Sequence, residues 1–218
     1  MATVIYVKNY APPKISVKEI LRYAGSKERS REMDTLLQEC IKEAEGKLSY
    51  KVCYAQFPVA VLEDGVDLGF TFVRSKSLAS NLKNCSRCIL FAATVGVGID
   101  RLIAKYTVLS PTKALLFQAI GAERIESLCD SFNREMQEKY KAVKPRFSAG
   151  YGDFPIETQK DIFVALECPK KIGVHLNESL LLSPSKSVTA IIGVCEKKDS
   201  EEKQGCFCCE KTDCDFRE

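Results

Sequence analysis

Hydrophobic residues in this sequence change their spacing several times along the chain, from the period of a helix to the alternation of a strand. Residues 30–45 place apolar side chains on one helical stripe, which Gly46 ends. Residues 48–73 alternate instead, with Asp64-Gly65 placed as a hairpin turn. Because the two periods do not follow a regular strand–helix–strand order, an α+β fold is favoured. We therefore expect a single mixed domain with a twisted, mainly antiparallel sheet packed with helices.

Local signals predict where most of the elements begin. The alternating run at 3–7 predicts a first strand. Ser16, with Glu19 three residues later, has the spacing of a helix capping box. The pair Ser110-Pro111 predicts a helix start, because proline suits the first helical position. The remaining expected elements are a short helix at 77–83, a buried strand at 88–93, a long helix reaching Tyr140, a short helix at 156–167, and two strands within 172–194 around a Ser183-Pro184-Ser185 turn.

Composition places the chain among ordinary globular proteins. Of its 218 residues, 45% are hydrophobic and 28% charged, and a net charge of +3 gives no reason to expect a nucleic-acid partner. No apolar run is long enough to span a bilayer, and the N-terminal residues lack the layout of a signal peptide. We therefore expect a cytoplasmic protein without a membrane partner. In that reducing setting, its 11 cysteines are expected to remain thiols or to bind metal.

The core-forming pattern ends at Cys195, where the composition changes. Residues 196–205 form a charged run that is typical of a linker, and residues 206–218 are rich in cysteine. We expect a folded body at 1–195 and a separate tail at 196–218.

The tail carries a possible metal-binding set. Cys206 and Cys209 have a chelate spacing, Cys214 can complete three thiolates, and Cys208 or Cys195 could add a fourth. Because so short and polar a tail cannot build its own core, a metal would give it a reason to fold. Zinc and an iron–sulfur cluster are equally open, and so are a redox disulfide and a tail of free thiols.

Other patterns are interpreted as structural. Cys85-x-x-Cys88 lacks a matching second pair, and Cys88 begins a buried strand, so we expect it in the core. Cys40 and Cys129 lie on apolar helical stripes and are expected to pack there. The glycine-rich run at 94–98 lacks the third glycine of a dinucleotide fingerprint and the lysine of a P-loop. It is expected to be a tight strand-to-helix turn.

The segment at 146–155, RFSAGYGDFP, has the chemistry of a small-ligand site. Arg146 offers a planar cation that suits a carboxylate. Gly150 and Gly152 would let a ligand approach the backbone closely, and Tyr151 offers a ring face and a hydroxyl. A tight turn with an aromatic plug and a surface arginine explains the same residues without any ligand.

Several short motifs follow the arginine in a fixed order. They are Arg146-x-x-x-Gly150-Tyr151, Pro155, Lys171-Ile172-Gly173, Leu176-Asn177-Glu178-Ser179 and Pro184-x-x-Ser187-Val188. Together they resemble the C-terminal activation domain of cobalamin-dependent methionine synthases over about 50 residues, from 146 to 194. The helix around 119–130 is similar more loosely, and the first 90 residues show little that matches.

The resemblance implies a binding site for S-adenosylmethionine. In the family an arginine and a glycine-tyrosine pair contact that ligand, and an acidic residue of the long helix contributes. The implied contacts here are Arg146, Gly150 and Tyr151, the backbone of Ser148 and Ala149, and Glu126. The family's C-terminal tyrosine has no counterpart in this sequence, so one wall of the site is expected to differ.

The resemblance also implies partners. An activation domain brings S-adenosylmethionine over oxidised cobalamin, while a flavodoxin- or ferredoxin-like protein donates one electron. Because 218 residues leave no room for folate, homocysteine and cobalamin modules, the partner is expected to be a separate methionine synthase or corrinoid protein. Such a domain needs to position its ligand more than it needs acid–base residues, and no nucleophile–histidine set can be assembled around the single His175. The alternative is a metal or iron–sulfur redox accessory protein acting through its cysteine tail.

Overall fold

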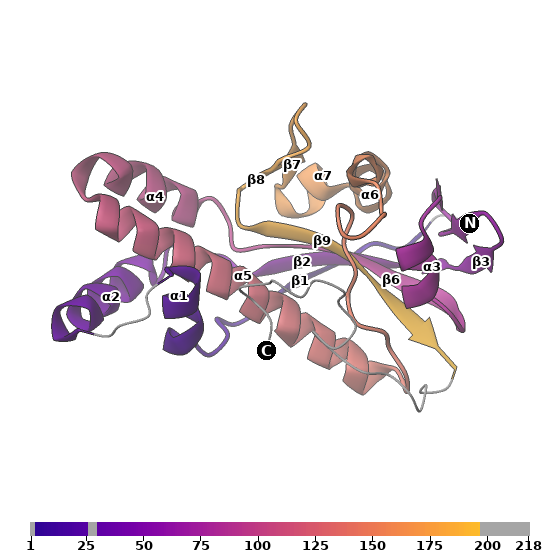
Figure 1. Ribbon diagram of the computed structural model, residues 1–218, viewed down its shortest axis with the longest axis horizontal. Coiled ribbons are helices and arrows are strands. Elements are labelled where there is room, and N and C mark those ends of the chain that lie inside the picture. Colours follow the sequence, from indigo (N-terminus) through magenta and orange to yellow (C-terminus); the bar gives the residue numbers. More distant parts are fainter. Residues whose placement is uncertain (1–2, 26–29, 197–218) are drawn as a thin grey trace.

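A four-stranded antiparallel sheet forms the centre of the computed structural model, which describes residues 3–25 and 30–196. Its strand order is β1-β2-β6-β9, and Figure 1 shows helices on both of its faces. The expected α+β class with a mainly antiparallel sheet is therefore confirmed. The four strands are β1 (Tyr6–Asn9), β2 (Lys51–Pro58), β6 (Cys85–Thr94) and β9 (Ser187–Cys195).

The central strand β6 shows why the sheet needs a helical layer on each side. Its residues from Cys88 to Thr94 are all buried, because successive side chains point to opposite covered faces. Ile89 and Phe91 belong to one hydrophobic cluster, while Cys88 and Leu90 belong to the other. The sheet therefore separates two cores.

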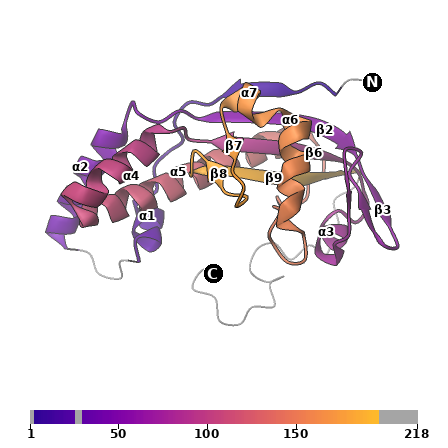
Figure 2. The same ribbon diagram turned by 90° about the horizontal axis from the view of Figure 1, so that it is seen from above.

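One core lies under the long helix. The helices on this side are α1 (Val17–Tyr23), α2 (Arg31–Ala44), α4 (Gly98–Leu109) and α5 (Pro111–Lys139). Serine side chains cap three of them: Ser16 accepts from the backbone N–H of Glu19, Ser30 from Met33 and Ser110 from Lys113. The helix starts at Ser16 and Ser110 were predicted from the sequence. Figure 2 shows α1, α2 and α4 gathered at one end of the molecule, from which α5 runs along the sheet.

The second core is covered by shorter elements. They are α3 (Lys76–Asn81), the 3-10 turn η1 (Ile156–Thr158), α6 (Gln159–Leu166), α7 (Cys168–Ile172), a three-stranded sheet of β3 (Ala60–Leu62), β4 (Gly65–Asp67) and β5 (Phe72–Val73), and a hairpin of β7 (His175–Leu176) and β8 (Leu182–Ser183). Figure 1 shows α6, α7 and this hairpin on the face opposite α5.

Some local expectations were wrong. The hairpin turn lies one residue earlier than predicted, because Gly65 already pairs with Leu62. Strands do flank Pro184 as expected, but they belong to different sheets: β8 pairs with β7, whereas β9 joins the central sheet beside β6. Glu167 adopts a left-handed backbone with φ of 48°, which ends α6 and starts the unexpected α7.

The expectation that the cysteines stay thiols or bind metal is wrong for one pair. Cys85 and Cys195 face each other on β6 and β9 and form a disulfide, with their Cα atoms 4.1 Å apart. Cys195 is therefore not available as the fourth metal ligand considered from the sequence. Cys40, Cys88 and Cys129 are buried thiols in the two cores, as predicted.

Candidate functional site

The chain before Arg146 is held along the outer edge of β9. Lys144 donates its backbone N–H to the Gly193 carbonyl over 2.8 Å, and Phe147 exchanges two backbone hydrogen bonds with Ile191 at 2.9 and 2.8 Å. The sheet therefore continues beyond β9 and fixes the backbone on both sides of Arg146. The next residues leave the edge and turn.

The turn at 148–154 is a compact, internally bonded loop and lies within the segment 146–155 for which the sequence left a tight turn as one reading. Gly150 donates to the Phe154 carbonyl over 2.8 Å, and Phe154 donates to the Tyr151 carbonyl over 3.0 Å. Gly150 has a φ of +94° and Gly152 a φ of +57°, which side chains other than glycine rarely adopt. A Cβ atom on Gly152 would also lie 2.6 Å from the Ser77 hydroxyl oxygen. Backbone geometry therefore requires glycine at both positions.

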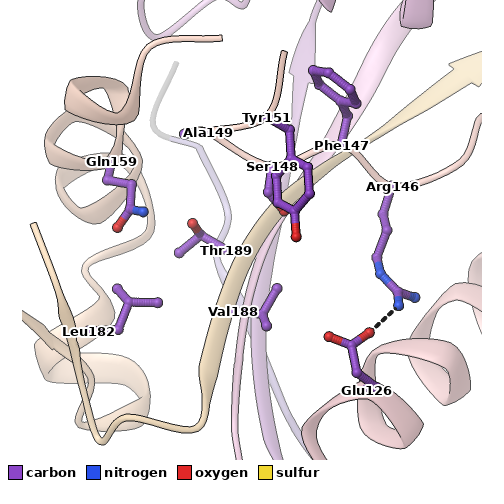
Figure 3. A pocket seen from close by; sticks show the side chains of 10 residues that line it. All are labelled: Glu126, Arg146, Phe147, Ser148, Ala149, Tyr151, Gln159, Leu182, Val188 and Thr189. Carbon is purple, nitrogen blue, oxygen red and sulfur yellow. Dashed lines mark hydrogen bonds and ion pairs between the residues drawn. The ribbon is translucent and has the colours of Figure 1, made fainter. Parts of the chain in front are cut away.

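A pocket of about 370 Å³ opens between this turn, β9, α5 and α6, a size within the usual range for small-molecule sites. Five of the six ligand contacts expected from the sequence line it, including Glu126, whose register on the long helix is now fixed. Gly150 does not line the pocket and shapes the turn instead. The lining residues, drawn in Figure 3, are Glu126, Arg146, Phe147, Ser148, Ala149, Tyr151, Gln159, Leu182, Val188 and Thr189.

One end of the pocket is charged. Arg146 lies 2.5 Å from the Glu126 carboxylate through Nη2 and 2.6 Å from the Asp130 carboxylate through Nη1. Burial alone would lower the pKa of Arg146, but the hydrogen bond with Asp130 and the charges of both carboxylates outweigh it and leave the pKa raised. Arg146 is therefore already paired with two acids, one of which is the Glu126 that the sequence placed at this site.

Asp130 was missed in the sequence analysis, although a signal was present. It follows Glu126 by four residues, so the two carboxylates lie one turn apart on the same face of α5. That spacing, read together with Arg146, would have indicated one cation between two acids.

The other end of the pocket is lined by uncharged side chains, one of which carries an amide. Figure 3 shows the Gln159 carboxamide reaching in from α6 toward Thr189 and Leu182, on the far side of Tyr151 from Arg146. Gln159 and Thr189 are buried, with 7% and 4% of their surface exposed. Tyr151 is 67% exposed at the rim. Neither Gln159 nor Thr189 was singled out from the sequence, since each lies on an element that looked purely structural.

The structure does not test the metal site predicted for the C-terminal tail. Cys206, Cys208, Cys209 and Cys214 lie outside the described residues. Within residues 3–25 and 30–196, no group of three or more histidine, cysteine, aspartate or glutamate side chains could hold a metal ion. In the same part of the chain, no helix is long and apolar enough to cross a membrane.

Fold and pocket together define an α+β domain with a ligand-sized cavity at the edge of its central sheet. Residues 130–202 match the sequence model of a family described as vitamin B12 dependent methionine synthase, activation domain. A solved MetH reactivation domain bound to AdoHcy has a similar fold, with a TM-score of 0.63 at 15% identity, over 91% of this chain and 80% of that one. Comparison with curated protein sequences found no match.

The resemblance recognised in the sequence is thus confirmed. Residues 130–202 carry the sequence pattern of the activation domain, and most of the chain has the fold of the reactivation domain. At 15% identity, the structural likeness establishes the fold alone.

Proposed function

We propose that this chain binds S-adenosylmethionine in the pocket beside Arg146 and supports reductive methylation of oxidised cobalamin on a separate methionine synthase or related corrinoid methyltransferase. The observation that carries the proposal is the ion-paired cluster of Arg146, Glu126 and Asp130 at one end of the cavity. The activation-domain match over 130–202 supports it, as does the AdoHcy bound to the structurally similar reactivation domain.

The charged end suits the amino-acid part of the ligand. A free α-amino acid carries a carboxylate and an ammonium group on one carbon, so its recognition needs both signs of charge close together. Arg146 would receive the carboxylate through its planar donor fork, while Glu126 and Asp130 would receive the ammonium group. An unpaired arginine would attract any small anion, whereas the mixed cluster favours a zwitterion.

The middle of the pocket suits a flat, partly apolar group. Tyr151 offers an exposed ring at the rim, and Ser148 and Ala149 place backbone along one wall. Val188 lines the pocket beside them. A nucleoside fits such a slot, because one ring face can stack while its edges remain open to polar contacts.

The role of these residues is to hold and orient. S-adenosylmethionine would supply the methyl group for cobalt, with one electron arriving from a flavodoxin- or ferredoxin-like donor. The paired arginine would fix one end of the ligand and the turn at 148–154 its middle. Holding a reactant in a fixed orientation removes most of the entropic cost of its encounter with a second reactant. No acid–base residue is required for that role.

Calorimetry with AdoHcy tests the site, because this ligand lacks the reactive methyl group. Arg146→Ala should weaken AdoHcy binding by about 10–100-fold, since a charge-assisted pair is lost. The same variant should bind 5′-methylthioadenosine, which has no amino-acid part, as the unchanged protein does. Arg134→Ala, which removes an exposed arginine of α5 away from the pocket lining, serves as the matched control. The proposal fails if the unchanged protein does not bind AdoHcy, and the site is wrong if Arg146→Ala binds it normally.

Reactivation itself needs a second assay. Oxidised, inactive partner enzyme is incubated with S-adenosylmethionine and a reducing donor, with and without this protein. Recovery of methyl-transfer activity only when the unchanged chain is present supports the function. Recovery that is equal with Arg146→Ala would show that the pocket is not involved.

The metal or iron–sulfur alternative rests on the spacing of Cys206, Cys208, Cys209 and Cys214 alone. Anaerobic reconstitution of the full chain and of a chain ending at Cys195, followed by iron and zinc analysis, decides it. Metal bound by the full chain but not by the shorter one would support a tail site. Absence of both metals from the full chain would remove the alternative.

A further inference from the structure

Gln159 lines the pocket and carries a side-chain oxygen that is buried without a hydrogen-bond partner among the described residues. Its Oε1 atom is buried and meets no donor in the described structure, although 93% of the residue surface is covered. Buried carboxamide oxygens are almost always paired, because an unpaired one loses its bonds to water and gains nothing. The side chain points into the same cavity that Arg146 closes at the other end.

The position of Gln159 restricts what its partner can be. The charged cluster of Arg146 and Glu126 lies on one side of Tyr151, and the carboxamide lies on the other. A ligand whose amino-acid part occupies the charged end must therefore place its opposite end near Gln159. In an S-adenosyl compound that opposite end is the adenine base.

Adenine has the pattern that a carboxamide recognises. On two of its edges, the N6 amino group lies beside a ring nitrogen that accepts a hydrogen bond. A glutamine can accept from N6 through Oε1 and donate to the ring nitrogen through Nε2, a pairing that also distinguishes adenine in protein–DNA complexes. Thr189 and Leu182 line the same end, and because neither carries a charge, this end suits an uncharged ring better than a charged group.

We infer that Gln159 is the specificity-determining residue of the pocket and reads the adenine edge of an S-adenosyl ligand by a two-point hydrogen bond. The inference rests on the proposed function and adds to it a residue that selects the base. The N6 amino group supplies the donor that Oε1 lacks.

A comparison of two ligands tests the role directly. The probes are AdoHcy and its 6-deamino analogue, in which hydrogen replaces the amino group of the base. The unchanged protein should prefer AdoHcy by about tenfold, the effect of one gained hydrogen bond to a buried acceptor. Gln159→Leu should bind both ligands with nearly equal affinity, mainly because its affinity for AdoHcy falls. Gln159→Met, which keeps the length of the side chain, should behave in the same way.

Two controls separate this inference from the proposed function. Gln118→Leu, an exposed glutamine on α5, should keep the full preference for AdoHcy. Arg146→Ala should weaken both ligands by the same factor and leave their ratio unchanged. Because the measured quantity is a ratio between ligands, a general loss of folding does not imitate the effect.

The outcomes are distinct. If the unchanged protein binds neither ligand, the proposed function fails and takes this inference with it. If it binds AdoHcy but Gln159→Leu and Gln159→Met keep its preference, only the role of Gln159 is overturned. Equal affinity of the unchanged protein for both ligands would overturn the role as well.

Discussion

The carboxylate of Asp153 accepts the hydroxyl hydrogen of Ser75 over 2.5 Å and so fastens the turn that carries Tyr151 to the start of α3. The same carboxylate accepts the backbone N–H groups of Lys76 and Ser77, at 2.7 and 3.0 Å. The hydrogen bond from Ser75, together with those two, holds the pKa of Asp153 well below its ordinary value of 3.8. One exposed acid therefore connects the candidate ligand turn to an element 76 residues away.

Asp153→Asn should loosen this connection and weaken AdoHcy binding by several-fold, because the amide cannot accept all three bonds as a carboxylate does. The thermal stability should also respond to pH. Since the folded-state pKa is lowered, the carboxylate stabilises the protein above about pH 4, and this contribution disappears as the pH falls through the folded-state pKa. The difference in melting temperature between the unchanged protein and Asp153→Asn should therefore shrink on acidification. Asp64→Asn, at an exposed turn, is the control, and a difference independent of pH would contradict the argument.

Neutralising the acids at the charged end of the pocket should weaken binding of the amino-acid part of the ligand and leave binding of its nucleoside part unchanged. Glu126→Gln and Asp130→Asn should each raise the dissociation constant for AdoHcy by about 5–20-fold, the usual loss for one charge-assisted bond. Neither should alter binding of 5′-methylthioadenosine, which has no ammonium group to recognise. Calorimetry with both compounds provides the measurement. Unchanged AdoHcy affinity in both variants would show that these carboxylates serve only to hold Arg146.

Local chemistry was predictable from the sequence wherever the deciding contact lies within a few residues. The helix starts at Ser16, Ser30 and Ser110 depend on hydrogen bonds to the third residue beyond, so the sequence alone contains both partners. The capping box was only half right. The backbone N–H of Ser16 is taken by Glu123, 107 residues away, and not by Glu19. A partner so far away in the sequence cannot be recognised from the residues around Ser16.

The candidate site shows the same difference between contacts within a few residues and contacts between distant segments. The glycine turn at 148–154 closes on itself, and its form followed from its residues. The ends of the pocket come from α5, α6 and β9, which meet only in the folded chain. Gln159 looks like an ordinary polar residue of an amphipathic helix until α6 packs on the sheet and buries it. The disulfide between Cys85 and Cys195 was missed because 110 residues separate its ends.

Removing that disulfide should destabilise the protein only under oxidising conditions. Cys85→Ser is expected to lower the free energy of unfolding by about 2–4 kcal/mol, because the cross-link restricts the unfolded chain. With a reducing agent present, the unchanged protein should lose most of this advantage and unfold close to the variant. Urea denaturation with and without reductant measures both values. The comparison between the two redox states serves as the control, because Cys85→Ser should cost little relative to the unchanged protein once its bridge is reduced.

The buried ion pair of Glu123 and Arg124 should be the most sensitive polar contact in the fold. Arg124 has 2% of its side chain exposed, pairs with Glu123 and donates to the backbone carbonyls of Pro13 and Lys14 at 2.5 and 2.9 Å. Glu123 in turn accepts the backbone N–H of Ser16 over 3.0 Å. These bonds attach the segment before α1 to the middle of α5.

Removing only the arginine of this pair should lower the free energy of unfolding more than removing the charges of both residues. Arg124→Met is expected to lower the free energy of unfolding by about 3–5 kcal/mol, because it leaves a buried carboxylate without its cation. Adding Glu123→Gln should recover part of that loss, since the remaining amide carries no charge to desolvate. Urea denaturation of the two variants, with the exposed Arg101→Met on α4 as control, gives the comparison. A double variant less stable than Arg124→Met would mean that Glu123 stabilises the fold through Ser16 independently of its arginine.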